Sequence, residues 1–305
     1  MLRIDTILRF FAEKTRRTPT FAHPISQLAS VDQIRDPIFE EWRIRFGMRP
    51  GLNRKLWEYL YIAQAIRDYI GFRPRRRVLG FGVGRERIPA VLANLDCEVL
   101  ATDWPAQRNI LDSSWAARGL DDLLHPLEDD WDPKLRDIPL CHPEVFRRNV
   151  TFQRVDMTDI PTDLRDFDAL WSCGSLEHLG SLRAGLEFIV NAMQCLRPGG
   201  VAVHTTEFNV SSNEATIELP DICLYRRRDI EELVRALRRA GHRIAVSFWR
   251  PNTPENTAVD EPPFNYEHTM NARHGNHVFT SIGLIAVKGG RTFPSAHQMD
   301  LTITA

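Results

Sequence analysis

Two glycines and an aspartate have the spacing of a site for a nucleoside. Gly82 and Gly84 follow a short apolar run, and Asp103 ends a second run about 19 residues after them. A glycine turn lets backbone N–H groups and the start of a helix approach a ligand, because no side chain blocks the way. A carboxylate that ends the second strand can accept hydrogen bonds from both hydroxyls of a ribose. The three residues therefore predict half of a binding site for a ligand that contains ribose.

The residues after the glycine pair discriminate between two classes of ligand. A dinucleotide prefers a third glycine at this point, but the chain has Arg85-Glu86-Arg87. A glutamate at the start of the helix repels a pyrophosphate, whereas it is compatible with the cationic sulfonium and ammonium groups of S-adenosylmethionine. The pattern favours S-adenosylmethionine as the cofactor and leaves an NAD-dependent oxidoreductase as an alternative.

His178 is the preferred candidate for acid–base chemistry, with Glu177 beside it. Both follow the apolar run 167–173, so we expect them at the carboxyl edge of the sheet, where ligands of open α/β folds bind. A neutral histidine there can take a proton from a hydroxyl that is being methylated. The alternative is a histidine that orders its loop through hydrogen bonds. His204 and Glu207, at the end of the next strand, are further candidates.

Four residues near the carboxyl end of the chain combine imidazole and carboxylate groups: Glu267, His268, His274 and His277. A metal ion needs such ligands clustered in space. Their spacing fits no established ligand pattern, and no metal is expected.

The elements that must hold these residues form an alternating series of strands and helices. Apolar runs predict seven strands, at residues 78–81, 97–103, 150–155, 167–173, 201–205, 242–249 and 277–287. Apolar residues recur with helical spacing at 52–70, 85–95, 181–196 and 229–240. Helices that separate successive strands predict a mostly parallel, doubly wound α/β sheet of the Rossmann-like kind.

The chain divides into three parts. Residues 1–75 are expected to form an N-terminal helical cap, residues 76–290 the ligand-binding domain with an insertion at about 104–149, and residues 291–305 a tail. The cap and the insertion are expected to cover an acceptor pocket. Apolar walls for that pocket are offered by Trp57, Tyr61, Trp115 and Phe208.

Composition disfavours several classes of function. The formal net charge is -1, so no overall positive field attracts nucleic acid or an anionic membrane. No run approaches the ~20 apolar residues that would span a bilayer. The five cysteines include no C-x-x-C pair, which is typical of reduced thiols in a cytoplasmic protein. A small-molecule or glycan acceptor remains the expected partner, and the sequence does not indicate an oligomeric state.

Several ordered motifs resemble those of class I S-adenosylmethionine-dependent methyltransferases. Residues 78–84 (VLGFGVG) with Asp103 are similar to the first two motifs of that family, and residues 155–157 (VDM) are similar to the third. Residues 167–178 (FDALWSCGSLEH) and 196–200 (LRPGG) resemble the motifs that follow. The match covers about residues 77–288 in the order of the family, and the ordered set is more specific than any single motif.

The resemblance implies an enzyme that takes a methyl group from S-adenosylmethionine. It places Asp156 against the adenine amino group, and Trp104 and Met157, beside the two acids, can flank the adenine. The implied cofactor-binding residues are Gly80, Phe81, Gly82, Gly84, Glu86, Asp103, Trp104, Asp156, Met157, Ser172 and Cys173.

Gly80 departs from the pattern of the family. Class I enzymes usually carry an acid two residues before the first loop glycine, and that acid helps to orient the amino-acid end of the donor. We expect either that Glu86 takes over this contact or that the donor binds more weakly. If the site has lost its activity, the chain is a regulatory or scaffold protein that binds a nucleoside without turnover.

Residues 54–58 (RKLWE) through the glycine loop also look like bacterial methyltransferases of glycan and secondary-metabolite pathways. This likeness suggests a small-molecule or sugar hydroxyl as the methyl acceptor, with His178 as the general base. Because one fold serves many acceptors, the acceptor and its reacting atom stay open.

Overall fold

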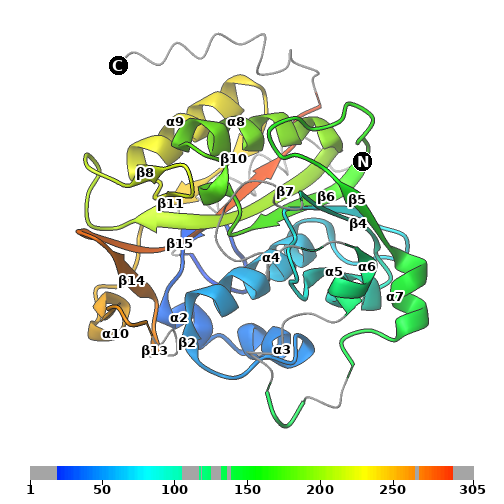
Figure 1. Ribbon diagram of the computed structural model, residues 1–305, viewed down its shortest axis with the longest axis horizontal. Coiled ribbons are helices and arrows are strands. Elements are labelled where there is room, and N and C mark those ends of the chain that lie inside the picture. Colours follow the sequence, from blue (N-terminus) through cyan, green and yellow to red (C-terminus); the bar gives the residue numbers. More distant parts are fainter. Residues whose placement is uncertain are drawn as a thin grey trace.

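The computed structural model describes residues 19–104, 117, 119–124, 132–135, 139–264 and 268–290 (Figure 1). Its centre is an 11-stranded sheet with the main order β11-β1-β15-β7-β6-β3-β4-β5. The parallel part consists of β3 (Arg77–Phe81), β4 (Glu98–Asp103), β5 (Val150–Arg154), β6 (Phe167–Cys173) and β7 (Leu196–Asn209). β15 (His277–Val287) lies antiparallel to β7. The expected doubly wound, mostly parallel α/β fold is confirmed.

The order of the strands creates a switch point between β3 and β6. From β3 the chain moves through β4 to β5 at one edge, and it then returns to β6 on the other side of β3. In sheets of this kind, the crevice outside the carboxyl ends of the strands at such a point binds ligands. The glycine loop follows β3 and residues 174–178 follow β6, so the segments expected to bind a ligand meet there.

The sheet is larger than the seven strands expected. The sixth expected strand, 242–249, is divided into β10 (Arg243–Ile244), which pairs with β15, and β11 (Val246–Ser247). Between β11 and β15 lies β1 (Ser26–Leu28), which belongs to the segment expected to be a cap. Two further strands, β12 (Val259–Asp260) and β14 (Asn271–His274), extend the sheet beside β15.

β1 cannot be recognised as an apolar run in the sequence, because it contains polar side chains that are hydrogen-bonded inside the protein. Ser26 and Gln27 are fully buried. The Ser26 hydroxyl accepts from the N–H of Ile285 at 2.8 Å. The Gln27 amide accepts from the N–H of Ile25 at 3.0 Å and donates to the carbonyl of Thr20 at 3.2 Å. Polar groups that are bonded in this way are tolerated in a core, so such a strand is not visible as an apolar run.

Helices cover both faces of the sheet (Figure 1). One face carries α3 (Pro37–Arg45), α4 (Arg54–Ile70), α5 (Ile88–Asn94) and α7 (Pro143–Asn149), which share one hydrophobic core. The other face carries α8 (Leu182–Ala192) and α9 (Arg227–Arg239), which belong to a second core. The short elements are α2 (Val31–Ile34), α6 (Leu120–Leu124), α10 (Pro254–Thr257), η1 (Leu176–His178), η2 (Met193–Cys195), β2 (Leu52–Asn53), β8 (Glu218–Leu219), β9 (Ile222–Cys223) and β13 (His268–Thr269).

α4 is a core helix and not a cap above the sheet. Asn53 caps its N-terminus by accepting a hydrogen bond from the N–H of Lys55 at 2.7 Å. Every residue from Leu56 to Ile66 is buried, and the helix packs on β6, β7 and β15. The approach to β15 is close because Gly283 has no side chain: a Cβ there would overlap the ring of Tyr61. The N-terminal segment is therefore built into the same core as the sheet.

About half of the insertion expected at 104–149, and all of the tail expected at 291–305, lie outside the described residues. Two helices of the insertion are described, and the second, α7, leads directly into β5. Among the helices that the structure describes, none has the length and apolar character of a membrane span.

Candidate functional site

The glycine loop after β3 is held against the segments that follow β5 and β6. Gly82 and Gly84 adopt left-handed backbone angles, with φ of 57° and 50°, which favour glycine. A Cβ at Gly82 would come within 2.9 Å of the Cβ of Ser175 and 3.0 Å of the Sδ of Met157. Two of the predicted cofactor-binding residues, Gly82 and Met157, therefore meet at the switch point, together with Ser175.

The hydroxyl of Ser175 lies at this loop without a partner. Its Oγ is buried and makes no hydrogen bond within the described part of the chain. It lies 3.1 Å from the position that a Cβ of Gly82 would take. A buried hydroxyl without a partner costs about 1–3 kcal/mol of stability. A polar ligand at the glycine loop would supply the missing hydrogen bond.

Gly80 is explained by the tryptophan beside it. A Cβ at position 80 would overlap the indole ring of Trp171. The indole N–H donates to Oε1 of Glu86 at 2.6 Å, and both side chains are buried. Burial raises the pKa of Glu86 well above its ordinary value, although the hydrogen bond from Trp171 opposes this. Glu86 therefore lies in a pocket in which a cationic ligand would favour its ionised form.

Asp103 ends β4 and is bonded to the backbone around it. Its Oδ1 accepts from the N–H of Trp104 at 2.8 Å, and its Oδ2 accepts from the N–H of Ala117 at 2.9 Å. Burial raises the pKa of Asp103, and N–H groups that include the one of Gly84 oppose the shift. Trp104 is 51% exposed next to this carboxylate. The position suits a ribose beside the glycine loop, although local capping accounts for the same hydrogen bonds.

Asp156 caps a turn after β5. Its Oδ1 accepts from the N–H of Thr158 at 2.8 Å and from the hydroxyl of the same residue at 2.6 Å. This local role accounts for the aspartate without a ligand, so its contact with an adenine stays a prediction.

A cluster of charged side chains from α4 lies against the carboxyl ends of β6 and β7. The Glu58 side chain at its centre is 1% exposed. One of its carboxylate oxygens accepts from Ser281 Oγ at 2.6 Å, and the other accepts from Thr205 Oγ1 at 2.9 Å and Lys55 Nζ at 3.2 Å. Burial alone raises the pKa of Glu58, but Lys55, Arg54 and the two hydroxyls outweigh burial, and the pKa lies below its ordinary value. Glu58 is therefore ionised at neutral pH.

Lys55 is the most accessible cation of this cluster. Its Nζ occupies the space in which a Cβ of Gly174 would lie, next to the carboxylates of Glu58 and Glu177. The Lys55 side chain is 35% exposed, compared with 14% for the Arg54 side chain. A molecule bound in the crevice can therefore reach Lys55, whereas the two carboxylates beside it are buried.

The side chains of β7 alternate between the faces of the sheet, and this separates two candidates. Glu207 points to α4, where Nη2 of Arg54 donates to it at 2.6 Å. His204 points to the opposite face, where it is 1% exposed and its Nδ1 lies 2.8 Å from Ser172 Oγ. Burial lowers the pKa of His204 to about 3. His204 is thus a neutral core histidine, and its prediction as a catalytic candidate is wrong.

The side chains of Phe81 and Cys173 also lie on opposite faces. Phe81 packs edge-on against Phe188 with ring centroids 5.2 Å apart, so its side chain belongs to the core under α8. The Sγ of Cys173 is 3.5 Å from Glu58, on the side of the charged cluster.

Glu177 and His178 lie in η1, directly after β6. Glu177 is 2% exposed and accepts from Thr206 Oγ1 at 2.8 Å, and burial raises its pKa. His178 is exposed, and its Nδ1 is 2.6 Å from the carbonyl oxygen of Asp221. Because a carbonyl can only accept, Nδ1 carries the proton, and Nε2 is the basic nitrogen of the neutral ring.

Trp57 and Tyr61 are core residues and not walls of an acceptor pocket. Their rings stack 4.5 Å apart, and neither is exposed. Trp57 Nε1 donates to Gln33 at 2.7 Å, and the Tyr61 hydroxyl donates to the carbonyl of Ile25 at 2.6 Å. Of the other predicted walls, Trp115 lies outside the described residues, and Phe208 lines a separate cavity.

Two histidines near the carboxyl end, His274 and His277, pair with each other across the turn between β14 and β15. His277 Nδ1 lies 3.3 Å from Asn209 Nδ2, and His274 is exposed. In the described ranges, no three His, Cys, Asp or Glu side chains form a group that could hold a metal. Glu267 and the side chain of His268 lie outside those ranges.

Sequence reasoning did not assign Arg54, Lys55 and Glu58 to the site. Residues three and four apart lie on one side of a helix, so the spacing alone brings the three together. The signal that could have found them is burial, because a charged side chain in a core needs charged or polar partners. Nothing local in the sequence indicates that this side of the helix is buried.

No family model matches the chain, and no curated protein matches it. Solved structures are similar to it at low identity. CurJ carbon methyltransferase is 14% identical over 78% of this chain and 54% of its own length, with a TM-score of 0.42. A putative sarcosine dimethylglycine methyltransferase from Galdieria sulphuraria is 11% identical over 83% of this chain and 99% of its own, with a TM-score of 0.44. The cyclase SpnF is 15% identical over 87% and 99%, with a TM-score of 0.44.

The chain thus spans about half the length of the CurJ protein. At these scores and identities the likeness carries no information about activity.

Proposed function

We propose that the protein is an S-adenosylmethionine-dependent methyltransferase. The observation that carries the proposal is the unpartnered hydroxyl of Ser175 at the glycine loop, at the switch point of a doubly wound sheet. The ordered motifs of residues 77–288 support the same conclusion. When bound, S-adenosylmethionine supplies a methyl group that is already activated on a sulfonium.

The charge around the crevice fits this cofactor better than a dinucleotide. Five carboxyl groups lie on the segments around the crevice together with the cations Arg54 and Lys55; the carboxyl groups are those of Glu58, Glu86, Asp103, Glu177 and Glu207. Arg85, which follows Gly84 in the glycine loop, adds a further cation. Such surroundings attract the sulfonium and ammonium groups and oppose a pyrophosphate.

The residues divide into a ribose side and an amino-acid side. Gly82 lets a ligand approach the loop closely, and Asp103, which already accepts from the N–H of Gly84, offers its carboxylate to the ribose hydroxyls. Glu86, whose pKa is raised by burial, would ionise beside an ammonium group and bind it. Trp104, which is exposed, and Met157, which is buried against the loop, would flank the adenine.

For the acceptor we propose a hydroxyl of a small molecule or a sugar, with His178 as the general base. The carbonyl of Asp221 fixes the Nδ1 proton of His178 and leaves Nε2 free to take the hydroxyl proton. The acceptor oxygen would then be free to attack the activated methyl group that S-adenosylmethionine would supply when bound. The five described cysteines are all unpaired and buried, which supports a cytoplasmic location.

Calorimetry tests the proposal directly. The purified protein is titrated with S-adenosylmethionine, S-adenosylhomocysteine and NAD. We expect micromolar affinity for the first two, which corresponds to about -8 kcal/mol, and no binding of NAD. Release of S-adenosylhomocysteine in the presence of a panel of glycosides and hydroxylated small molecules then identifies the acceptor.

Ser175→Ala tests the observation that carries the proposal. Removing an unpartnered hydroxyl should leave the free energy of unfolding unchanged or raise it, while the affinity for S-adenosylhomocysteine falls. A loss of stability in Ser175→Ala without loss of affinity would show that the hydroxyl has an internal role and would contradict the proposal.

Binding without turnover is the second candidate function. The observation that favours it is that Asp103 and Asp156 are both engaged by nearby backbone groups. Affinity for S-adenosylhomocysteine with no methylation of any acceptor in the panel would support this regulatory or scaffold reading.

A further inference from the structure

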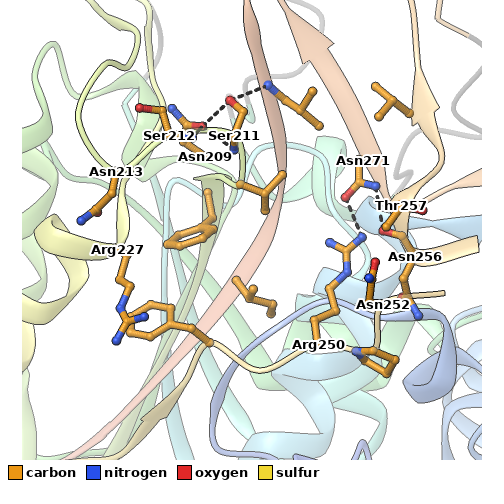
Figure 2. Close-up of a pocket in the computed structure, with 17 residues that line it drawn as sticks. Asn209, Ser211, Ser212, Asn213, Arg227, Arg250, Asn252, Asn256, Thr257 and Asn271 are labelled. Atoms are coloured by element: carbon orange, nitrogen blue, oxygen red, sulfur yellow. Dashed lines mark hydrogen bonds between the residues drawn. The ribbon is translucent and has the colours of Figure 1, made fainter. Parts of the chain in front are cut away.

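A second cavity lies on the other side of β7 from the charged cluster. It has a volume of about 670 Å³, which is in the range of sites for drug-sized ligands. Its walls come from the end of β7, the segment after β11, α10, β14 and the start of α9 (Figure 2). None of the residues assigned above to the cofactor lines it. Phe208, which was predicted to face the acceptor, lies in this cavity, stacked on Phe248 with centroids 5.7 Å apart.

Most amides of the cavity form its frame and are not available to a ligand. Asn271 accepts from Arg250 and donates to two carbonyls. Asn256 accepts from the N–H of Val31 and donates to Asp32. Asn209 is likewise bonded through both ends of its amide. These bonds fix the walls, so the cavity is formed before any ligand arrives.

Arg250 is a cation in this cavity without an anionic partner. Within the described residues its guanidinium makes one hydrogen bond, to the neutral amide of Asn271 at 2.8 Å. No Asp or Glu is among the described residues that line the cavity. Burial lowers the pKa of Arg250 to about 10, and the side chain is still charged at neutral pH. Burial has removed part of the water that would solvate the Arg250 guanidinium. A bound anion would compensate for this loss with a charge-assisted hydrogen bond.

The other arginine of the cavity is already neutralised. Arg227 donates to Glu231 at 2.8 Å, and its guanidinium lies 5.0 Å from the centroid of the Phe248 ring. In Figure 2, Arg227 lies on one side of the cavity, and Arg250 lies on the other with Asn252 next to it. Asn252 makes no hydrogen bond within the part of the chain that the structure describes, so its amide can bind a ligand beside Arg250.

We propose that this cavity is a binding site for an anionic ligand, in which Arg250 binds a carboxylate or phosphate group and the apolar walls hold the rest of the molecule. The apolar walls are Leu28, Phe208, Val210, Phe248, Pro251, Val259 and Val278. The ligand class is an amphipathic anion with one acidic group and an apolar body. The site is independent of methyl transfer, because its residues and its charge differ from those of the cofactor crevice.

Three probes with the same apolar body test the charge requirement: 2-naphthoate, 2-naphthyl phosphate and 2-naphthalenemethanol. Each is titrated into the full-length protein by calorimetry. We expect at least one of the two anions to bind about tenfold or more tightly than the alcohol, because a hydrogen bond to a charged group contributes more than a neutral one. The stronger of the two anions tells whether the site prefers a carboxylate or a phosphate.

Variants of Arg250 test whether the anion binds in this cavity. Arg250→Gln should reduce the affinity for the anion to that for the alcohol, and Arg250→Lys should keep part of the preference. Arg183→Gln is the matched control, since Arg183 lies on α8, pairs with Glu187 and does not line the cavity. Equal binding of all three probes, no binding of either anion, or an unchanged anion preference in a folded Arg250→Gln protein would each overturn the proposal. If Arg250→Gln does not fold, the comparison of the probes on the unaltered protein still decides it.

Discussion

The indole ring of Trp171 fills the space above Gly80, and its N–H donates to Glu86. Three residues, from β3, from β6 and from the loop before α5, are therefore fitted to one another. This fit explains why the position that carries an acid in the resembling family is a glycine here. Glu86 brings a carboxyl group next to Trp171, and we propose that it takes over the contact of the missing acid.

Gly80→Ala should destabilise the protein. The added methyl overlaps Trp171, and overpacking of a core costs about 1–3 kcal/mol. Urea unfolding measures the change. The cost should shrink in a Trp171→Phe background, where the overlap with the indole ring is absent, but part of it should remain because the Cβ also overlaps Cγ1 of Val83. Gly119→Ala, in open space, is the control and should stay within about 0.5 kcal/mol of the unaltered protein.

Glu86→Gln should weaken ligands that carry the amino-acid group. The amide oxygen of glutamine can still accept from Trp171, so we expect the fold to be retained. The affinity for S-adenosylhomocysteine should fall about tenfold or more, because a hydrogen bond to a charged group is lost. 5′-Methylthioadenosine lacks the ammonium and should bind equally to both proteins. An equal loss for both ligands would show that Glu86 supports the loop and not the ammonium.

Glu58→Gln should cost roughly 3–5 kcal/mol of unfolding free energy at pH 7, because it leaves buried cations without their carboxylate. The pKa of Glu58 is lower in the folded than in the unfolded protein. Its ionisation therefore stabilises the fold above the unfolded pKa, and this contribution is lost as the pH falls through the folded value. The difference between the two proteins should shrink below about pH 4.5. Glu41→Gln, at an exposed ion pair, should show almost no difference at any pH.

His204 should make the protein sensitive to mild acid. Its folded pKa of about 3 lies below the unfolded value of about 6.5. Between these values the unfolded chain binds a proton that the folded chain does not, so stability falls as the pH falls, by about 1.4 kcal/mol per unit. His204→Gln should remove this part of the slope between pH 6 and 4, and the part that comes from His242, whose pKa burial lowers to about 4, should remain. His23→Gln, at an exposed histidine, should leave it unchanged.

His178→Gln should lower kcat by about 10²–10⁴-fold if His178 removes the acceptor proton. The loss should appear in kcat, while the affinity for S-adenosylhomocysteine stays the same. A variant that loses affinity but keeps kcat would assign His178 to loop structure, through its hydrogen bond to Asp221.

The features of the fold that depend on local sequence patterns could be predicted from the sequence. Alternating apolar runs indicated the parallel strands, and glycine spacing indicated the loop at the end of β3. The sequence could not predict β1, because the polar residues of that strand are satisfied by partners far away in the chain. The sequence also could not show that Glu207, and not His204, lies on the face of the sheet that α4 covers. Alternation along a strand assigns residues to two faces, but it does not indicate which face packs against α4. Glu58 was missed for the same reason: its partners lie on β7 and β15, and no local pattern shows them.

The burial of α4 links the stability of the fold to the proposed chemistry, because the same helix contributes to the core and to the crevice. Its amino-terminal turn carries Arg54, Lys55 and Glu58 at the crevice, and the following turns fill the core against β15. A fragment of residues 76–290 would expose the apolar surface that α4 covers and lose one charged wall of the crevice. We therefore expect the helix and the sheet to melt in a single cooperative transition. We expect that cutting the chain at residue 76 yields no stably folded fragment.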